Sequence, residues 1–273
     1  MQEFPSVPHV ADAPPELLAS GHLWIQECVD GLGLRFSLAE SGLVVFGDGE
    51  ATYRTESMPL PYRHAVRHVR ERLDRDGLRD AVDDVEAVTF FGVATTHRTV
   101  DYDWDRTPSF LGVDVWSGER LLPPDAVEKI FERLGLEPVN AFEREVRAVD
   151  FRPESYEVPP SAWYDGPAAG VLLRSKTGGR AVLSRESTGD VEPFDGTAAD
   201  VAGRVVTGDR VAAAVAALEA LDRPADPEEV TARVVEAVVR EHHGRLAADA
   251  TGFDLDAFRS AVATAVQRRR NER

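Results

Sequence analysis

The chain of 273 residues is poor in lysine, because only two of its 31 basic residues, Lys129 and Lys176, are lysines and the others are arginines. Its single cysteine, Cys28, excludes an intramolecular disulfide and a metal site built from a cysteine cluster. No stretch approaches the ~20 consecutive apolar residues that a membrane-spanning helix needs. The first 19 residues contain neither an apolar run nor a basic leader. We therefore expect a soluble, cytoplasmic protein without a signal peptide or a membrane partner.

Acidic residues outnumber basic ones, and the formal net charge is −17 at pH 7. A charge of this size destabilises a compact fold by self-repulsion. The acid-rich, lysine-poor composition therefore predicts a halophilic protein in a salty cytoplasm, and GC-rich coding equally explains the arginines. The total charge does not exclude RNA as a partner, since local patches of charge decide nucleic-acid binding.

Short β-rich runs dominate the first two thirds of the chain. The predicted strands are 23–28, 32–38 and 43–47, which the turns between them indicate to be a meander, two buried strands at 88–95 and 110–116, and a hairpin of 170–174 with 180–183. The predicted helices of this part are 61–76, opened by a proline, and 124–134, ended by a glycine.

The character of the sequence changes near residue 187. Residues 187–198 are rich in turn formers and acids and are predicted to be a linker. From 199 to 273 alanine and valine recur without a strand pattern, and the predicted amphipathic helices are 209–221, 227–240 and 254–270. The sequence thus predicts an α+β domain over residues 1–186 and a small helical domain at 199–273.

Five segments carry a resemblance to a known family. They are Glu27-Cys28-Val29-Asp30-Gly31, Phe90-Phe91-Gly92-Val93, Phe110-Leu111-Gly112-Val113-Asp114-Val115, Ala169-Gly170-Val171-Leu172-Leu173 and Arg180-Ala181-Val182-Leu183. In order and spacing they resemble the motifs of the ATP-dependent RNA ligases, which belong to the covalent nucleotidyltransferases. The resemblance covers residues 20–185. It implies an ATP-grasp-like ligase adenylation domain of antiparallel sheets with flanking helices, to which a helical accessory domain is added.

The resemblance also implies a nucleotide pocket and a role in RNA repair. The pocket candidates are Glu27, Asp30, Gly31, Arg35, Gly92, Asp114, Gly170, Arg174 and Lys176. An active site of this kind would use ATP with Mg²⁺ or Mn²⁺ to join 3′-OH and 5′-phosphate RNA ends through an enzyme–AMP intermediate. We expect no other metal site.

The positions that carry the family's chemistry hold other residues here. Cys28 stands where the family has its nucleophilic lysine, Val93 and Ala169 stand at two glutamates, and Val182 stands at a second lysine. Arginine cannot replace the nucleophile, because a guanidinium group stays protonated. Cys28 is nucleophilic only as a thiolate, which cationic neighbours favour, whereas its neighbours are acidic. A small, buried strand cysteine is the simpler interpretation.

Basic residues elsewhere offer weaker candidates. Lys176 follows the hairpin strand and could reach a phosphate, or could simply belong to the turn. Arg63, Arg67 and Arg70 share one side of the predicted helix 61–76 and could bind an RNA backbone, or could be solvated.

Histidine and aromatic residues give two further candidates. His64 and His68 have a spacing that can bind zinc, but no third ligand is evident and a solvated helix face is the favoured interpretation. Tyr102 and Trp104 could stack on a base or pack within their loop.

The sequence therefore predicts an RNA-ligase-like protein that is degenerate at its catalytic site and binds RNA ends or a protein partner. Two alternatives stay open. One is an active ATP-dependent RNA ligase with an unrecognised nucleophile, and the other is a purely structural interaction protein. The sequence does not specify the oligomeric state.

Overall fold

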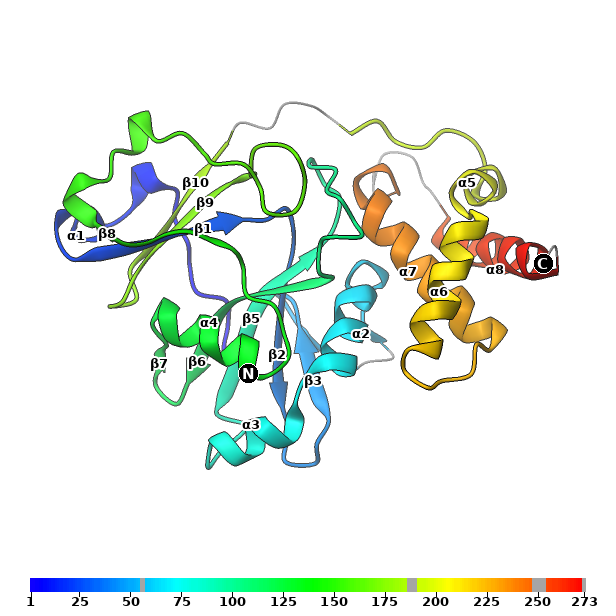
Figure 1. The fold of residues 1–273 in the computed structure, drawn as a ribbon, viewed down its shortest axis with the longest axis horizontal. Helices are drawn as coiled ribbons and strands as arrows, with labels where there is room; N and C mark the ends of the chain where they lie inside the picture. The colour runs from blue at the N-terminus through cyan, green and yellow to red at the C-terminus, as the bar shows by residue number, and fades with distance from the viewer. Residues whose placement is uncertain (55–56, 186–190, 247–253, 272–273) are drawn as a thin grey trace. The chain divides into compact units, whose positions relative to one another are not determined.

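The computed structural model describes residues 1–54, 57–185, 191–246 and 254–271, and the chain divides into two compact units (Figure 1). One unit comprises residues 1–95 and 102–188, and the other comprises residues 96–101 and 189–273. The short segment 96–101 thus belongs with the C-terminal helices, although it lies inside the predicted first domain. Within the described ranges, no helix combines the length and the apolar character needed to cross a membrane.

The larger sheet of the first unit is antiparallel, with the strand order β4-β3-β2-β5-β6-β7. Its strands are β2 (Gly31–Leu38), β3 (Val44–Gly47), β4 (Thr52–Tyr53), β5 (Val88–Thr95), β6 (Phe110–Ser117) and β7 (Arg120–Leu121). One face is covered by η3 (Leu60–Tyr62), α2 (Arg63–Arg72), α3 (Arg75–Ala81) and α4 (Pro124–Arg133) (Figure 1).

Phenylalanine side chains form the centre of the core between this sheet and its helices. Phe36 of β2 stacks on Phe90 of β5 with ring centroids 4.7 Å apart, and Phe131 of α4 meets Phe90 edge-on at 5.8 Å. All three are fully buried, and burying such a side chain stabilises the fold by roughly 1.5–3 kcal/mol. Alternation along β2 sends Leu34 and Phe36 toward the helices and Arg35 to the opposite face.

The smaller sheet is also antiparallel, with the strand order β10-β9-β1-β8. Its strands are β1 (His22–Cys28), β8 (Ala141–Arg147), β9 (Gly170–Ser175) and β10 (Arg180–Ser184), and the short helices near it are η1 (Val10–Asp12), α1 (Glu16–Ala19), η4 (Ala148–Asp150) and η5 (Pro153–Ser155). Its outer face forms a separate apolar cluster that includes Leu17, Leu23 and Val171.

Two predictions about these elements are wrong. The first three strands do not form one meander, because β1 pairs with β8 and β9 while β2 and β3 belong to the larger sheet. The predicted helix 61–76 is broken after Arg72, since Asp74 caps a new helix by accepting a hydrogen bond from the Gly77 amide at 2.8 Å. Strands β4, β7 and β8 have no counterpart in the prediction.

The second unit contains α5 (Ala198–Val205), α6 (Gly208–Glu219), α7 (Pro227–Leu246) and α8 (Leu255–Asn271). The last three correspond to the predicted helices. Helix α5 was not predicted. It begins at Ala198, the last residue of the predicted linker, and continues into the predicted helical domain. Its signal is a capping box, in which Thr197 and Asp200 each bind the other's backbone amide. The predicted linker residues 187–190 lie outside the described residues.

Helix α7 runs beyond its predicted end and is kinked at His242, where φ is −129°. The segment that follows β5 causes the kink. The His97 amide donates to the Arg240 carbonyl at 2.8 Å, and the Gly244 amide donates to the His97 carbonyl at 2.7 Å. These bonds occupy backbone groups that would otherwise continue the helix.

Candidate functional site

The motif positions lie on the faces that the two sheets of the first unit turn toward each other. Alternation along β1, β9 and β10 points Cys28, Arg174 and Val182 away from the outer apolar cluster. Alternation along β5, and the pairing of Phe91 with Asp114, place Val93 and Asp114 on the face opposite the helices. A contact between Arg174 and Asp114 shows that the two faces adjoin.

Asp114 is the centre of a buried ion cluster between the sheets. One carboxylate oxygen binds Arg174 of β9 and the other binds Arg180 of β10. The three side chains are between 2% and 7% exposed. Arg174 also donates to Gln26 Oε1 at 3.1 Å and to the Val113 carbonyl at 2.7 Å. Because buried charges are tolerated only when they are paired in this way, the cluster ties the two sheets together.

The structure thus brings two predicted pocket residues, Asp114 and Arg174, into direct contact. Arg174 is 2% exposed and both of its Nη atoms are engaged within the protein, which leaves it poorly placed to bind a phosphate. Arg180 completes the cluster, a role that its place in the last motif did not reveal.

Cys28 is the last residue of β1, and its backbone pairs with Gly170 of β9. Burial, together with the nearby acids Asp30 and Glu27, raises the pKa of the Cys28 thiol to about 11. At that pKa only about one thiol in 10,000 is ionised at pH 7. Cys28 is half-buried rather than fully buried, and the raised pKa of its thiol favours the interpretation of Cys28 as a structural cysteine.

Glu27 is 1% exposed and anchors a loop to β1. Its carboxylate accepts hydrogen bonds from Ser161 Oγ at 2.6 Å, the Ala162 amide at 3.1 Å and Asn140 Nδ2 at 3.2 Å. Burial raises the pKa of Glu27, although these hydrogen bonds act in the opposite direction. Ser161 and Asn140 carried no recognisable signal in the sequence.

Aromatic side chains close the region beside Asp30. Tyr102 is 3% exposed, and its hydroxyl accepts a hydrogen bond from the Asp30 amide at 2.8 Å. Its ring meets Trp104 and Tyr164 edge-on, at 5.7 and 5.4 Å. A ring enclosed in this way favours packing within the loops over stacking on a base.

The N-terminal segment lies on the same inter-sheet side of the larger sheet as Arg35. The Gln2 carbonyl accepts a hydrogen bond from Arg35 Nη1 at 2.6 Å. The Phe4 ring packs on Phe91 with centroids 5.3 Å apart. Farther along, the Pro8 carbonyl accepts a hydrogen bond from the Val182 amide at 2.9 Å, at the edge of the smaller sheet. Residues 2–8 therefore contact the inter-sheet side of the larger sheet and the edge of the smaller one, which the sequence did not indicate.

The retained motif glycines have packing roles. A Cβ at Gly92 would lie 2.3 Å from the Phe110 ring, and one at Gly170 would lie 2.4 Å from the Leu183 carbonyl oxygen. At Gly31, the first residue of β2, a Cβ would lie 2.4 Å from the Ala94 carbonyl oxygen. These positions require glycine whether or not a nucleotide binds.

The donor set on this face does not fit ATP with a divalent metal. Val93 and Val182 on this face, and Ala169 just before β9, carry no donor or charge on their side chains, and the Asp114 carboxylate is committed to two arginines. Across the part of the chain that the structure describes, no group of three or more His, Cys, Asp or Glu side chains could hold a metal ion.

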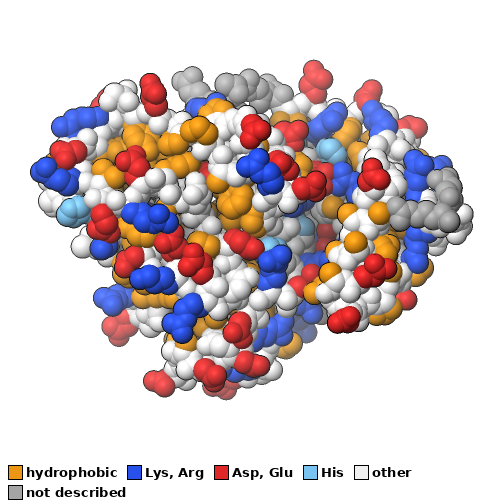
Figure 2. All heavy atoms as spheres, in the orientation of Figure 1, with side chains coloured by type: hydrophobic (Ala, Val, Ile, Leu, Met, Phe, Trp, Pro, Cys, Tyr) orange, Lys and Arg blue, Asp and Glu red, His pale blue; other side chains and the backbone are white. Residues whose placement is uncertain are grey.

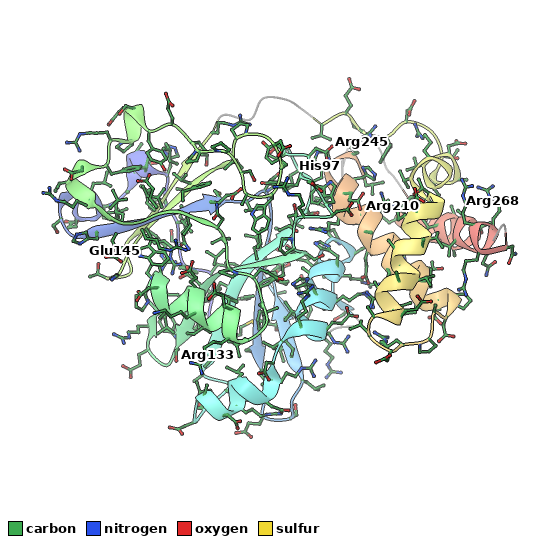
Figure 3. The ribbon with its side chains drawn as sticks, viewed as in Figure 1. His97, Arg133, Glu145, Arg210, Arg245 and Arg268 are labelled. Atoms are coloured by element: carbon green, nitrogen blue, oxygen red, sulfur yellow. The ribbon has the colours of Figure 1, made fainter. Side chains whose placement is uncertain are left out.

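The remaining candidates lie elsewhere in the first unit. Lys176 forms an ion pair with Glu145, which is labelled in Figure 3, with Nζ 2.9 Å from Oε1. This hydrogen bond raises the pKa of Lys176. On α2, Arg63 donates to the Met58 carbonyl at 3.0 Å, whereas Arg70 is exposed. Arg67 lies 3.9 Å from Glu71.

The histidines of α2 do not form a solvated face, so that interpretation is wrong. His64 is 6% exposed, and His68 Nε2 lies 3.0 Å from Glu137 Oε2. The helix points this side toward the protein because β6 and the loop after α4 pack against it.

Comparisons with known proteins agree with this architecture. No model of a known protein family matches the chain, and no curated protein matches it. Among solved structures, it is similar to a mutant Naegleria gruberi RNA ligase with ATP and Mn, at 10% identity and a TM-score of 0.54, over 68% of this chain and 56% of that one. It is also similar to an archaeal ATP-dependent RNA ligase, at 16% identity and a TM-score of 0.51, over 98% of this chain and 74% of that one.

These likenesses decide the fold. The chain has an RNA-ligase-like nucleotidyltransferase fold. The predicted α+β class, with antiparallel sheets, flanking helices and C-terminal helices, is confirmed. The chain spans little more than half the length of the Naegleria ligase, and at this level of identity the likeness extends to the fold and not to the activity.

Proposed function

We propose that this chain is a catalytically degenerate RNA-ligase-like protein that binds RNA ends without transferring a nucleotide to itself. One observation carries the proposal. Where the resemblance puts the nucleophilic lysine, the chain has Cys28, and the pKa of its thiol is raised to about 11. An amine or thiol attacks phosphorus only in its deprotonated form. This position therefore offers no nucleophile near neutral pH.

The surroundings of Cys28 support the same conclusion. The uncharged side chains of Val93, Ala169 and Val182 stand at the family's charged positions. Removing one oriented group of this kind typically costs about 3 kcal/mol of transition-state stabilisation, or roughly a hundredfold in rate. The loss of several leaves little to stabilise a transferring phosphate.

Lys176 is the lysine that an active ligase would have to recruit from this region. Its ion pair with Glu145 raises its pKa, which lowers the fraction of free amine at neutral pH. The pair thus supports a structural role for Lys176 rather than a catalytic one.

Covalent labelling tests whether the site is inactive. The full chain is incubated with α-labelled ATP and Mg²⁺ or Mn²⁺ at low and high salt and is then run on a denaturing gel. We expect no label on the wild-type protein. We expect none on Cys28→Lys either, because the neighbouring charges stay absent. Label that survives in wild type and is lost in Lys176→Arg would overturn the proposal and identify the nucleophile.

RNA binding is the second half of the proposal. Over the face shown in Figure 2, acidic and basic side chains are interspersed and form no single basic patch. Arg70 of α2 is nevertheless exposed, beside Arg63 and Arg67 on the same helix. Each phosphate that an arginine neutralises makes RNA affinity depend on salt. For single strands, a plot of the logarithm of the binding constant against the logarithm of the salt concentration has a slope of about −0.7 per phosphate.

Fluorescence anisotropy with short 5′-phosphorylated RNA at several salt concentrations measures this binding. We expect salt-dependent affinity that weakens several-fold in Arg70→Gln. The salt dependence of the binding constant should also become less steep, by the amount that corresponds to about one phosphate contact. Arg79→Gln is the matched control, because Arg79 is a partly exposed arginine of α3 paired with Asp76. Affinity that is absent at every salt concentration, in a protein that binds protein partners, would favour the purely structural alternative.

A further inference from the structure

A cavity of about 330 Å³ lies on the helix-covered face of the larger sheet. Phe90 and Val115 line it from β5 and β6, Leu78 lines it from α3, and Leu134 lines it just beyond α4. These four side chains are at most 6% exposed, so the cavity reaches the core of the first unit. Its volume is at the lower end of the range of small-molecule sites, about 300–1,000 Å³.

The cavity is separate from the motif face. Phe90 and Val115 point toward the helices, whereas their neighbours Phe91 and Asp114 point toward the smaller sheet. The sheet itself therefore stands between the cavity and the ion cluster. A ligand here would not compete with the N-terminal segment, and the question is independent of nucleotide transfer at Cys28.

Few polar groups line the cavity, and one of them is a cation. Arg133 is the exposed last residue of α4 (Figure 3). Among the residues that the structure describes, no carboxylate lies within ion-pair distance of Arg133. Asp74 also lines the cavity, but one of its oxygens is engaged in capping α3. An arginine beside an apolar cavity matches a ligand that has an apolar body and one carboxylate.

We propose that this cavity binds a small aromatic or branched aliphatic carboxylate. The apolar body lies on Phe90 and Val115, and the carboxylate lies against the guanidinium group of Arg133. The volume of about 330 Å³ limits the ligand to a single small ring or a short branched chain. The charge of the ligand is set by Arg133.

A pair of probes separates the apolar contribution from the charged one. 3-Phenylpropanoate and its neutral amide have the same shape, and both are titrated into the full chain at constant ionic strength while protein NMR shifts are recorded. We expect the carboxylate to bind about tenfold more tightly than the amide. In Arg133→Gln the two affinities should become equal, with that of the amide unchanged. Lys129→Gln, an exposed cation on the same helix that does not line the cavity, should behave as wild type.

Filling the cavity gives the second test. Ile130 lines it from α4 and is only partly buried, so Ile130→Trp should remove the binding of both probes while the protein keeps its circular dichroism spectrum. Ala81→Phe, at the exposed end of α3, fills the cavity from the other side if the first variant does not fold. Binding that persists in a folded filled variant overturns the proposal. So does equal affinity of the wild type for the two probes, or no binding of either up to its solubility limit.

Discussion

The two faces of the larger sheet are built on different principles. The face under the helices is stabilised by apolar area alone, with Phe36, Phe90 and Phe131 in mutual contact and fully buried. The opposite face is buried with its charges, and there Asp114 holds two arginines from the smaller sheet. On the motif face, the charges of Asp114, Arg174 and Arg180 join the two sheets. The positions whose charge would serve only chemistry, such as Cys28 and Val182, are uncharged.

The difference has its largest expected consequence at Asp114. Replacing Asp114 with alanine leaves two guanidinium groups buried without a counterion, and breaking a buried pair in this way costs about 3–5 kcal/mol. Denaturant unfolding at fixed salt measures the loss. Asp150→Ala is the control, because Asp150 pairs with Arg147 on the surface, at 3.4 Å, where both side chains are more than half exposed. Equal losses in the two variants would contradict the view that the inter-sheet cluster holds the sheets together.

A second change tests whether the cluster does anything beyond joining the sheets. In Asp114→Leu with Arg174→Met and Arg180→Leu, the charged side chains are replaced by apolar ones of similar total volume. Replacing a buried ion cluster in this way is often neutral, or stabilising by about 1–4 kcal/mol. We expect the triple variant to recover most of the stability that Asp114→Ala loses. A triple variant that is as unstable as the single one would show that the hydrogen bonds of Arg174 to Gln26 and Val113, rather than its ion pair, hold the two sheets together.

The reactivity of Cys28 tests whether its surroundings disfavour a negative charge on the thiol. The pKa of its thiol, about 11, is two units above the ordinary value of 9.0, so the thiolate fraction is about a hundredfold lower at neutral pH. We expect iodoacetamide to label the native protein at least a hundredfold more slowly than a cysteine peptide. The rate should rise about tenfold per pH unit between pH 7 and 9. Rapid labelling that saturates near pH 7 would indicate a reactive thiolate and would reopen the question of catalysis.

The sequence predicted the apolar face better than the charged one, for a physical reason. The apolar run of β5 and the proline and glycine that bound α4 identify these two elements almost to the residue, because such signals are local in the sequence. Strand β1 pairs with β8 and β9, which lie far along the chain, and no turn motif in the sequence predicts such a pairing. Motif order identified Asp114 and Arg174 as neighbours of one site. It could not show that they bind each other, because that depends on how two sheets face one another.

Glu27 gives the smallest effect and tests, through pH, a buried carboxylate that is held by hydrogen bonds from Ser161, Ala162 and Asn140. Burial raises the pKa of Glu27 above its unfolded value, so its protonated form favours the folded state. The associated stability is present below about pH 4.5 and is lost as pH rises through the folded pKa.

Comparison with Glu27→Gln isolates this contribution. The wild type should lose stability relative to the variant as pH rises above 4.5, by about 1.4 kcal/mol for each unit of pKa shift. Glu137→Gln should show the opposite trend. Burial acts to raise the pKa of Glu137, but the hydrogen bond with His68 and the charges of His68 and Arg72 lower it. The wild type should therefore lose stability relative to that variant as pH falls. Urea unfolding from pH 4 to pH 8 measures both differences, and parallel trends in the two variants would show that the carboxylate of Glu27 is stabilised by its three hydrogen bonds more than it is penalised by burial.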